Sequence, residues 1–175
     1  CIGPSEEHVS MAGIPTEASI LDMVERAMPG RVQNVYAHSS GGGKFIAVIQ
    51  FKKTVPSDEG RQRQAALLAF SAFPELKQVI LVDEDVDIFD TNDVLWAMTT
   101  RMQADVDIVT IPGVRCHPLD PSNDPACSWS IRDHGIACKT IYDATVPFNQ
   151  KARFQRAKFM EVDVKKFLPD FTVQD

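Results

Sequence analysis

Residues 79–111, VILVDEDVDIFDTNDVLWAMTTRMQADVDIVTI, decide the fold class of this chain. The stretch opens with a wholly apolar run at residues 79–82, which is typical of a strand buried on both faces of a sheet. A helix is expected over residues 92–103, with Thr91 as its cap, and a second strand over residues 106–111. Strands that alternate with helices predict a largely parallel sheet with helices packed on its faces.

The preceding part of the chain is expected to add two helices. Residues 1–15 contain glycine and proline and are expected to be irregular. The first helix is expected to begin at Thr16, whose hydroxyl can cap it, and to end before Pro29 and Gly30. Another helix is expected over residues 58–73, where alanine, leucine and phenylalanine recur on one side.

Further strands are expected on both sides of residues 79–111. Residues 32–38 and the apolar run at residues 45–51 predict two strands, and the serines and glycines between them predict a turn, hence a hairpin or a closely spaced pair. Residues 136–142 predict another strand. The segment 112–135 is rich in proline and small polar residues, and we expect it to be a long loop that is functional or mobile.

These elements predict one α/β domain over residues 1–175, a three-layer Rossmann-like fold with a mostly parallel central sheet and helices on both faces. The net charge of -6 disfavours a nucleic-acid partner, and no apolar run is long enough for a membrane span, so neither partner is expected. The four cysteines form no C-x-x-C pair and no signal peptide is evident, which favours reduced thiols and a cytoplasmic location.

Acidic residues follow the predicted strand at residues 79–82. Asp83, Asp85 and their neighbours would lie beyond a carboxyl end of the sheet, where ligands commonly bind in open α/β folds. An Asp-x-Asp pair there could hold a hard cation, as in metal-dependent nucleotide-sugar transferases. A solvated acidic turn, with Asp90 and Asp93 capping the next helix, is the favoured interpretation, because two carboxylates without a nearby base or nucleotide loop are a weak signal, and the cation site stays open as the alternative.

Three other places in the sequence contain residues that could bind a ligand. The glycines at residues 41–43, followed by Lys44, match no phosphate-binding motif and favour a turn. His117 could contact a substrate or be an exposed loop residue. Lys139 could pair with Asp143 for structural reasons or bind a ligand phosphate or carboxylate.

Four segments, taken in order, resemble the C-terminal part of UbiD-family decarboxylases. They are residues 13–21 (GIPTEASIL), 79–87 (VILVDEDVD), 93–101 (DVLWAMTTR) and 143–145 (DAT) after Lys139. The later stretch TIYDATVPF, followed by RFQRAKF, is most similar to phenolic acid members of the gallate or protocatechuate type.

The resemblance implies a longer carboxy-lyase that removes carbon dioxide from a small aromatic acid. An N-terminal domain would bind prenylated FMN, a flavin, with manganese and potassium, and would carry a catalytic Glu-Arg-Glu set. That set is missing from these 175 residues, so neither catalytic residues nor metal ligands are expected in this chain. The C-terminal domain would close the substrate pocket and build a homo-oligomer, a dimer or larger. A non-catalytic oligomerisation module is a further alternative.

The resemblance also implies particular residues. Its substrate-facing positions fall at His117 and Leu119, with Arg115 beside them, and a histidine where cinnamate-type relatives have an apolar aromatic implies a hydroxylated aromatic acid. Lys139 is a candidate for binding the cofactor. A lysine that some relatives place near the cofactor phosphate falls at about Ser71, which removes that contact here.

Overall fold

A computed structural model describes residues 6–117, 120, 122, 136–157 and 166 of the chain. Its helices and strands are α1 (Glu6–Ala27), β1 (Val32–Ala37), β2 (Ile46–Phe51), α2 (Arg61–Ala72), β3 (Gln78–Val82), α3 (Thr91–Arg101), α4 (Ala104–Asp107), β4 (Ile108–Arg115) and β5 (Ile136–Ala144). Three short 3-10 helices, η1 (Ser39–Gly41), η2 (Pro56–Asp58) and η4 (Phe148–Arg153), lie between or after them.

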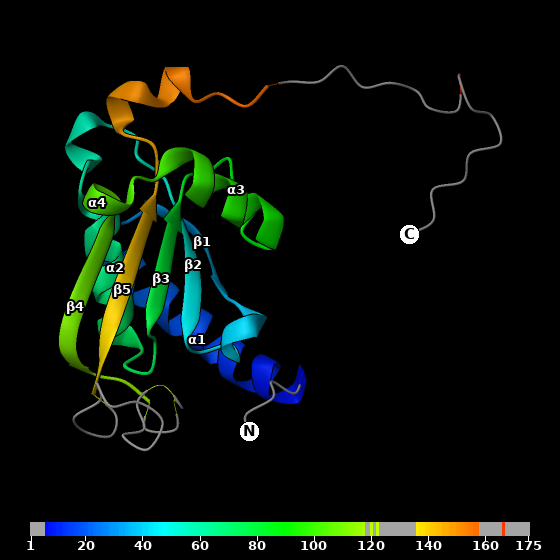
Figure 1. Ribbon diagram of the computed structural model, residues 1–175, viewed down its shortest axis with the longest axis vertical. Helices are drawn as coiled ribbons and strands as arrows, with labels where there is room; N and C mark the ends of the chain where they lie inside the picture. Colours follow the sequence, from blue (N-terminus) through cyan, green and yellow to red (C-terminus); the bar gives the residue numbers. More distant parts are fainter. Residues whose placement is uncertain (1–5, 118–119, 121, 123–135, 158–165, 167–175) are drawn as a thin grey trace.

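The five strands form one sheet in the order β1-β2-β3-β5-β4 (Figure 1). The three central strands β2, β3 and β5 run parallel, whereas the edge strands β1 and β4 run antiparallel to their neighbours. The mostly parallel sheet and the β1–β2 hairpin expected from the sequence are therefore confirmed.

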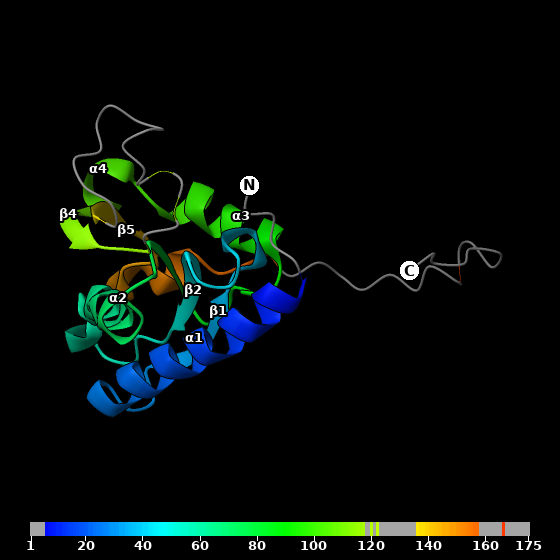
Figure 2. The same ribbon diagram turned by 90° about the horizontal axis from the view of Figure 1, so that it is seen from below.

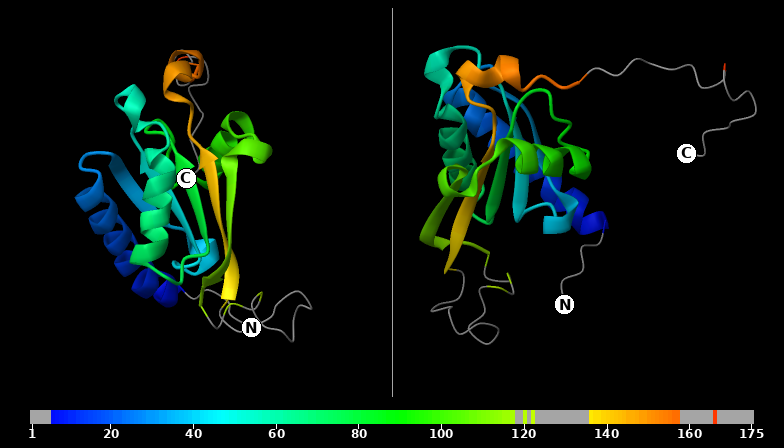
Figure 3. Two further views of the ribbon diagram at one scale, coloured as in Figure 1. Left: turned by 90° about the vertical axis from the view of Figure 1, so that its left-hand side faces the viewer. Right: turned by 45° about the horizontal axis from the view of Figure 1, so that its top comes forward.

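Helices cover both faces of the sheet, as expected. Side chains alternate along β2, so Ile49 joins the core beneath α1 and α2 while Val48 joins the core beneath α3. Figures 2 and 3 show α1 and α2 side by side on one face and α3 on the other. Strands buried on both faces explain why the central apolar runs are continuous rather than alternating.

The start of the first helix differs from the prediction. α1 begins at Glu6 and passes through Pro15, so residues 6–15 are helical rather than irregular. Thr16 does not cap the helix: it is buried, and its hydroxyl donates to the carbonyl oxygen of Ala12 at 2.7 Å. Packing of α1 against β1, where Gly13 lies close to Ala37, outweighs the local signal of the proline.

Two other boundaries also differ. Asp90 caps α3 instead of Thr91, because its Oδ1 accepts a hydrogen bond from Asn92 N at 2.9 Å. Strand β4 does not stop at Pro112 but continues to Arg115.

The longer β4 shortens the segment that was expected to be a loop. A register shift between Ile111 and Val114 absorbs Pro112 and Gly113 as a bulge, which an edge strand tolerates. Residues 112–115 therefore belong to the sheet. Most of the remaining stretch, 116–135, lies outside the described residues, and its expected role stays a prediction.

The glycine-rich turn between β1 and β2 is held tightly against α1. Gly43 has a φ of +69°, and a Cβ atom placed on it would lie 2.6 Å from the carbonyl oxygen of Val9 and 2.9 Å from Gly13 N. Both the backbone conformation and the space therefore require glycine.

Replacing Gly43 with alanine is expected to lower the free energy of unfolding by about 1–3 kcal/mol, the usual cost of a strained backbone conformation, plus the cost of the clash. Gly30→Ala is the matched control, because Gly30 has a similar φ of +72° but open space at its Cβ position. Urea unfolding of the chain measures both. Equal losses in the two variants would mean that the close approach to α1 contributes nothing.

Asp58 organises the connection between β2 and α2. The residue is fully buried, and its Oδ2 accepts hydrogen bonds from Thr54 N at 2.8 Å and Val55 N at 3.1 Å, while Oδ1 lies 3.0 Å from Arg31 Nε. Burial raises the pKa of Asp58, but the two backbone donors and the Arg31 charge outweigh it and hold the pKa below its ordinary value.

Asp58→Asn is expected to cost about 3–5 kcal/mol of stability at neutral pH, because it leaves buried donors poorly matched and Arg31 without its charge partner. A lowered carboxyl pKa contributes stability above its unfolded value, about pH 4, that is lost as the pH falls through the folded value. The gap between variant and wild type should therefore narrow in acid. Asp22→Asn, in an exposed ion pair, should cost about 1 kcal/mol or less at any pH.

Candidate functional site

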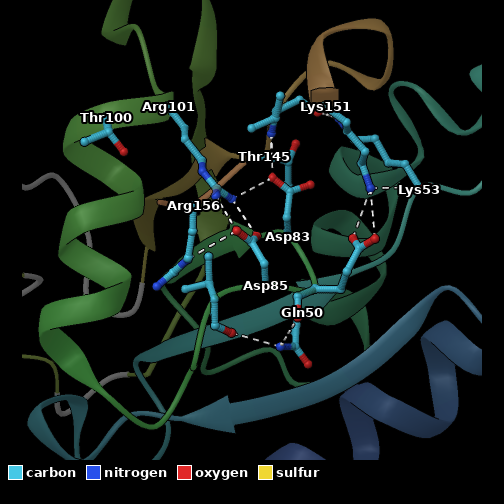
Figure 4. A network of polar contacts seen from close by, with 12 residues as sticks. Gln50, Lys53, Asp83, Asp85, Thr100, Arg101, Thr145, Lys151 and Arg156 are labelled. Atoms are coloured by element: carbon cyan, nitrogen blue, oxygen red, sulfur yellow. Dashed lines mark hydrogen bonds and ion pairs between the residues drawn. The ribbon is translucent and has the colours of Figure 1, made fainter. Parts of the chain in front are cut away.

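The acidic residues after β3 are bound by an arginine from α3. Arg101 Nη1 donates to Asp83 Oδ2 at 3.0 Å and to Asp85 Oδ1 at 2.8 Å, and Nη2 donates to Asp85 Oδ2 at 2.6 Å (Figure 4). The Arg101 side chain is only 2% exposed. This paired geometry is the strongest form of carboxylate recognition by arginine.

A second layer of charge ties the chain after β5 to the same place. Arg156 lies 3.3 Å from Asp85 and 2.8 Å from Asp93, and Lys151 lies 3.0 Å from Glu84. The guanidinium groups of Arg101 and Arg156 both lie over the Trp96 ring, at 4.9 and 4.3 Å from its centroid. We call Asp83, Glu84, Asp85, Asp93, Arg101, Lys151 and Arg156 the carboxyl-end cluster.

The pKa values of Asp83 and Asp85 are shifted in opposite directions. Burial dominates at Asp83 and raises its pKa, although Val146 N donates to it at 2.7 Å and Arg101 is adjacent. At Asp85, burial is outweighed by the hydrogen bonds and charges of Arg101 and Arg156, which hold its pKa below the ordinary value. Of the two carboxylates, Asp83 therefore has the larger free-energy cost of burial, and the charge of Arg101 offsets part of that cost.

These contacts favour neither the cation site nor a solvated acidic turn, because Asp83 is buried and paired with Arg101. Arg101 binds Oδ2 of Asp83 and both oxygens of Asp85, and within the described residues no group of three or more acidic, cysteine or histidine side chains is arranged to hold a metal. A cavity of about 420 Å³ lies beside the cluster, but cationic side chains also line it. The cluster therefore serves to hold α3 and η4 at the end of the sheet.

Arg101→Leu is expected to destabilise the chain by about 3–5 kcal/mol at neutral pH, because it leaves the buried carboxylate of Asp83 without its cation. The deficit should shrink as the pH falls, since a protonated Asp83 no longer needs that charge. Urea unfolding at several pH values measures both effects. Lys151→Met, at a partly exposed ion pair, is the control and should cost about 1 kcal/mol or less. A loss no larger than in that control would contradict the assigned role.

A different group of side chains lies at the opposite end of β3. His117 Nε2 lies 3.4 Å from Glu75 Oε1, and Lys44 Nζ lies 3.9 Å from Glu75 Oε2. The Phe45 ring meets the His117 imidazole edge to face, with centroids 5.8 Å apart. We call Lys44, Phe45, Glu75 and His117 the amino-end group. It combines an aromatic surface with hydrogen-bonding groups.

A cavity of about 260 Å³ adjoins the amino-end group. It is lined by Ser40, Gly41, Phe45, Ile46, Lys77, Gln78 and Asp120. Lys77 Nζ donates to Asp120 Oδ2 at 2.7 Å, and Asp120 is buried. The Lys77 ammonium and the backbone N–H of Ser122 hold the pKa of Asp120 below its ordinary value, against the effect of burial. Phe45 therefore borders both the cavity and His117.

The structure separates the residues that the sequence singled out. His117 lies in the amino-end group with its side chain 13% exposed, whereas Arg115 ends β4 and is exposed. Leu119 lies outside the described residues. Lys139 is 4% exposed, and its ammonium donates to the carbonyl oxygen of Pro74 at 2.7 Å and lies over the Phe70 ring.

Lys139 is therefore used inside the domain. Burial lowers the pKa of its ammonium. Its expected partner Asp143 instead accepts from Arg63 Nε at 2.7 Å and from Gln62 Nε2 at 3.0 Å. The expected Lys139–Asp143 pair is therefore wrong, and Pro74 and Phe70 are the contacts of the Lys139 ammonium.

Sequence reasoning missed Lys44 and Glu75 as members of a site. In the sequence, Lys44 follows a glycine-rich turn, and no motif surrounds Glu75. Neither belongs to a recognisable motif, and the three charged or polar members are far apart in the chain. One pattern in the sequence does bring them together: Lys44 and Glu75 each lie just before one of the parallel central strands, β2 and β3.

The fold and the amino-end group together define an α/β domain with a polar and aromatic site at the amino ends of its parallel strands. Residues 9–144 match the family model described as the 3-octaprenyl-4-hydroxybenzoate carboxy-lyase C-terminal domain. The chain therefore belongs to this family, the UbiD-type carboxy-lyases, as the sequence resemblance implied.

Named relatives agree with this assignment. The chain is 62% identical over 169 residues to gallate decarboxylase of Lactiplantibacillus plantarum. This alignment covers 95% of the chain and 34% of the relative. It superposes on a 3,4-dihydroxybenzoic acid decarboxylase from Enterobacter cloacae with a TM-score of 0.87 at 63% identity, covering 97% of this chain and 35% of that one. The UbiD-class enzyme HmfF from Pelotomaculum thermopropionicum, solved with FMN, gives a TM-score of 0.80 at 33% identity, covering 95% and 35%.

The chain spans about a third of the length of these relatives. None of them supports the nucleotide-sugar transferase alternative, which the ion pairs of Asp83 and Asp85 also disfavour. Of the helices that the structure describes, not even the longest is apolar enough over a sufficient length to cross a membrane.

Proposed function

We propose that this chain is the C-terminal, substrate-facing domain of a decarboxylase that acts on a hydroxylated aromatic acid such as a dihydroxybenzoate or gallate. The observation that carries the proposal is the pairing of His117 with the Phe45 ring at a partly open end of the sheet. An aromatic surface suits the ring of a phenolic acid, and an imidazole can hydrogen-bond its hydroxyls.

The chemistry of the proposed enzyme depends on a cofactor outside this chain. The HmfF relative was solved with FMN, and the prenylated form with manganese and potassium is our proposal for the whole protein. Lys139, the cofactor-binding candidate in this chain, has its ammonium engaged by Pro74 and Phe70 inside the domain. We therefore assign the cofactor to the rest of the longer protein and derive no step through it.

The part that this domain would play is recognition and exclusion of water. The His117 side chain is mostly buried, and its imidazole would offer a ring hydroxyl of the substrate a hydrogen bond that a substrate without a hydroxyl cannot make. Phe45 would contribute apolar contact area beside it. Leu119 and Arg115 remain proposed neighbours of the substrate on the strength of the resemblance.

Oligomerisation and cellular location belong to the proposal as well. We propose that the whole protein forms a homo-oligomer, a dimer or larger, and that it works in the cytoplasm. The mass of the full-length protein in solution tests the first point.

The proposed function is tested with the full-length protein loaded with cofactor. We expect it to release carbon dioxide from 3,4-dihydroxybenzoate or gallate. His117→Phe is expected to lower kcat/KM for these acids by about ten- to one-hundred-fold, since it removes a hydrogen bond in a largely buried place. Product formation measured by chromatography gives both values.

Arg115→Ala is a useful comparison, because this exposed residue should change kcat/KM less than His117 does. The same variants should be assayed on cinnamate, which has no ring hydroxyl. His117→Phe is expected to reduce the preference of the enzyme for dihydroxylated acids over cinnamate. Full activity of His117→Phe on the dihydroxylated acids would rule out the recognition role.

A further inference from the structure

Glu75 contacts two members of the amino-end group through different oxygens. Its Oε1 lies 3.4 Å from His117 Nε2, and its Oε2 lies 3.9 Å from Lys44 Nζ. The Glu75 side chain is 40% exposed, whereas those of His117 and Lys44 are 13% and 28% exposed. One carboxylate therefore links an imidazole to an ammonium at the border of the domain.

These three residues come from separate segments that the fold brings together. Lys44 ends the turn between β1 and β2, Glu75 lies between α2 and β3, and His117 follows β4. The backbone around them is anchored. Both Lys77 N and Gln78 N donate to the Phe45 carbonyl oxygen at 2.9 Å, and the Cys116 thiol donates to the Glu75 carbonyl oxygen at 3.4 Å.

Phe45 completes the arrangement between the two partners of Glu75. Its ring packs edge to face against His117, and Lys44 Nζ lies 5.8 Å from its centroid. The aromatic ring limits how far either side chain can swing, while the carboxylate supplies the polar contact. Geometry of this kind fixes a histidine ring and the position of its hydrogen.

From this arrangement we propose that Glu75 is a positioning residue that holds His117 and Lys44 together for contact with the ring hydroxyls of the substrate. The inference rests on the proposed function and adds to it the residue that organises recognition. A carboxylate beside Nε2 favours a hydrogen on that nitrogen and restrains the imidazole. It also restrains the long lysine side chain before substrate arrives, so that less order must be created on binding.

The test uses Glu75→Gln in the full-length, cofactor-loaded enzyme. The amide keeps the size of the side chain but loses its charge and one acceptor oxygen. We expect KM for 3,4-dihydroxybenzoate to rise about three- to tenfold while kcat changes by less than about twofold, as for a lost binding contact. Inhibition by catechol should weaken by a similar factor, whereas inhibition by benzoate, which lacks ring hydroxyls, should be unchanged.

A double-mutant cycle separates positioning from a general structural effect. If Glu75 acts partly through His117, Glu75→Gln should raise KM less in a His117→Asn background than in the unaltered enzyme, the remainder coming from Lys44. Glu25→Gln is the matched control, because this exposed glutamate on α1 only accepts a hydrogen bond from Gly30 N. It should leave KM and both inhibition constants unchanged.

Several outcomes would overturn the inference. These are an unchanged KM in Glu75→Gln, equal weakening of catechol and benzoate, or the same effect with and without His117. Because Glu75 is partly exposed, the variant should fold with a Tm within about 2 °C of the wild type. Should it not fold, Glu75→Asp takes its place, and a KM unchanged in that variant overturns the inference.

Failure of the underlying function gives a different result. If the unaltered, cofactor-loaded enzyme turns over no hydroxylated aromatic acid, the proposed function falls and the inference falls with it. If the unaltered enzyme is active and Glu75→Gln behaves like Glu25→Gln, only the inference falls.

Discussion

The ion pairs of Arg101 are the interaction on which the carboxyl end of this domain depends. One nearly buried guanidinium binds two carboxylates after β3, and Asp83 in turn accepts from the backbone of Val146 after β5. Two neighbouring parallel strands and helix α3 are thereby joined at one point. A buried charge is costly alone, so each partner is tolerable only while the others are in place.

The carboxyl-end cluster and the amino-end group lie at opposite ends of the sheet. In open α/β sheets, ligands usually bind beyond the carboxyl ends of the strands. Here Arg101 and Arg156 pair with the carboxylates at that end, whereas the amino-end group, for which we propose substrate recognition, lies at the opposite end of β3. The proposed site therefore lies at the end of the sheet opposite to the usual one.

The sequence predicted the sheet better than the site. Apolar runs such as residues 45–51 and 79–82 identify central strands because burial on both faces leaves little choice of residue. The predicted start of α1 and the predicted end of β4 were wrong, because tertiary packing overrode the local signals of Pro15 and Pro112. His117 was found through resemblance. Glu75 was missed because only the fold brings it to His117, and no pattern of spacing encodes that contact.

The bulge in β4 has a consequence for how copies of the domain can meet. β4 is an outer strand of the sheet, and there Pro112 lacks an N–H while Gly113 turns the backbone out of register. An incoming strand would find an interrupted ladder of hydrogen bonds along this edge. The backbone thus disfavours growth of the sheet on that side, and a copy of the domain that met this edge would have to be held by side chains rather than by an added strand.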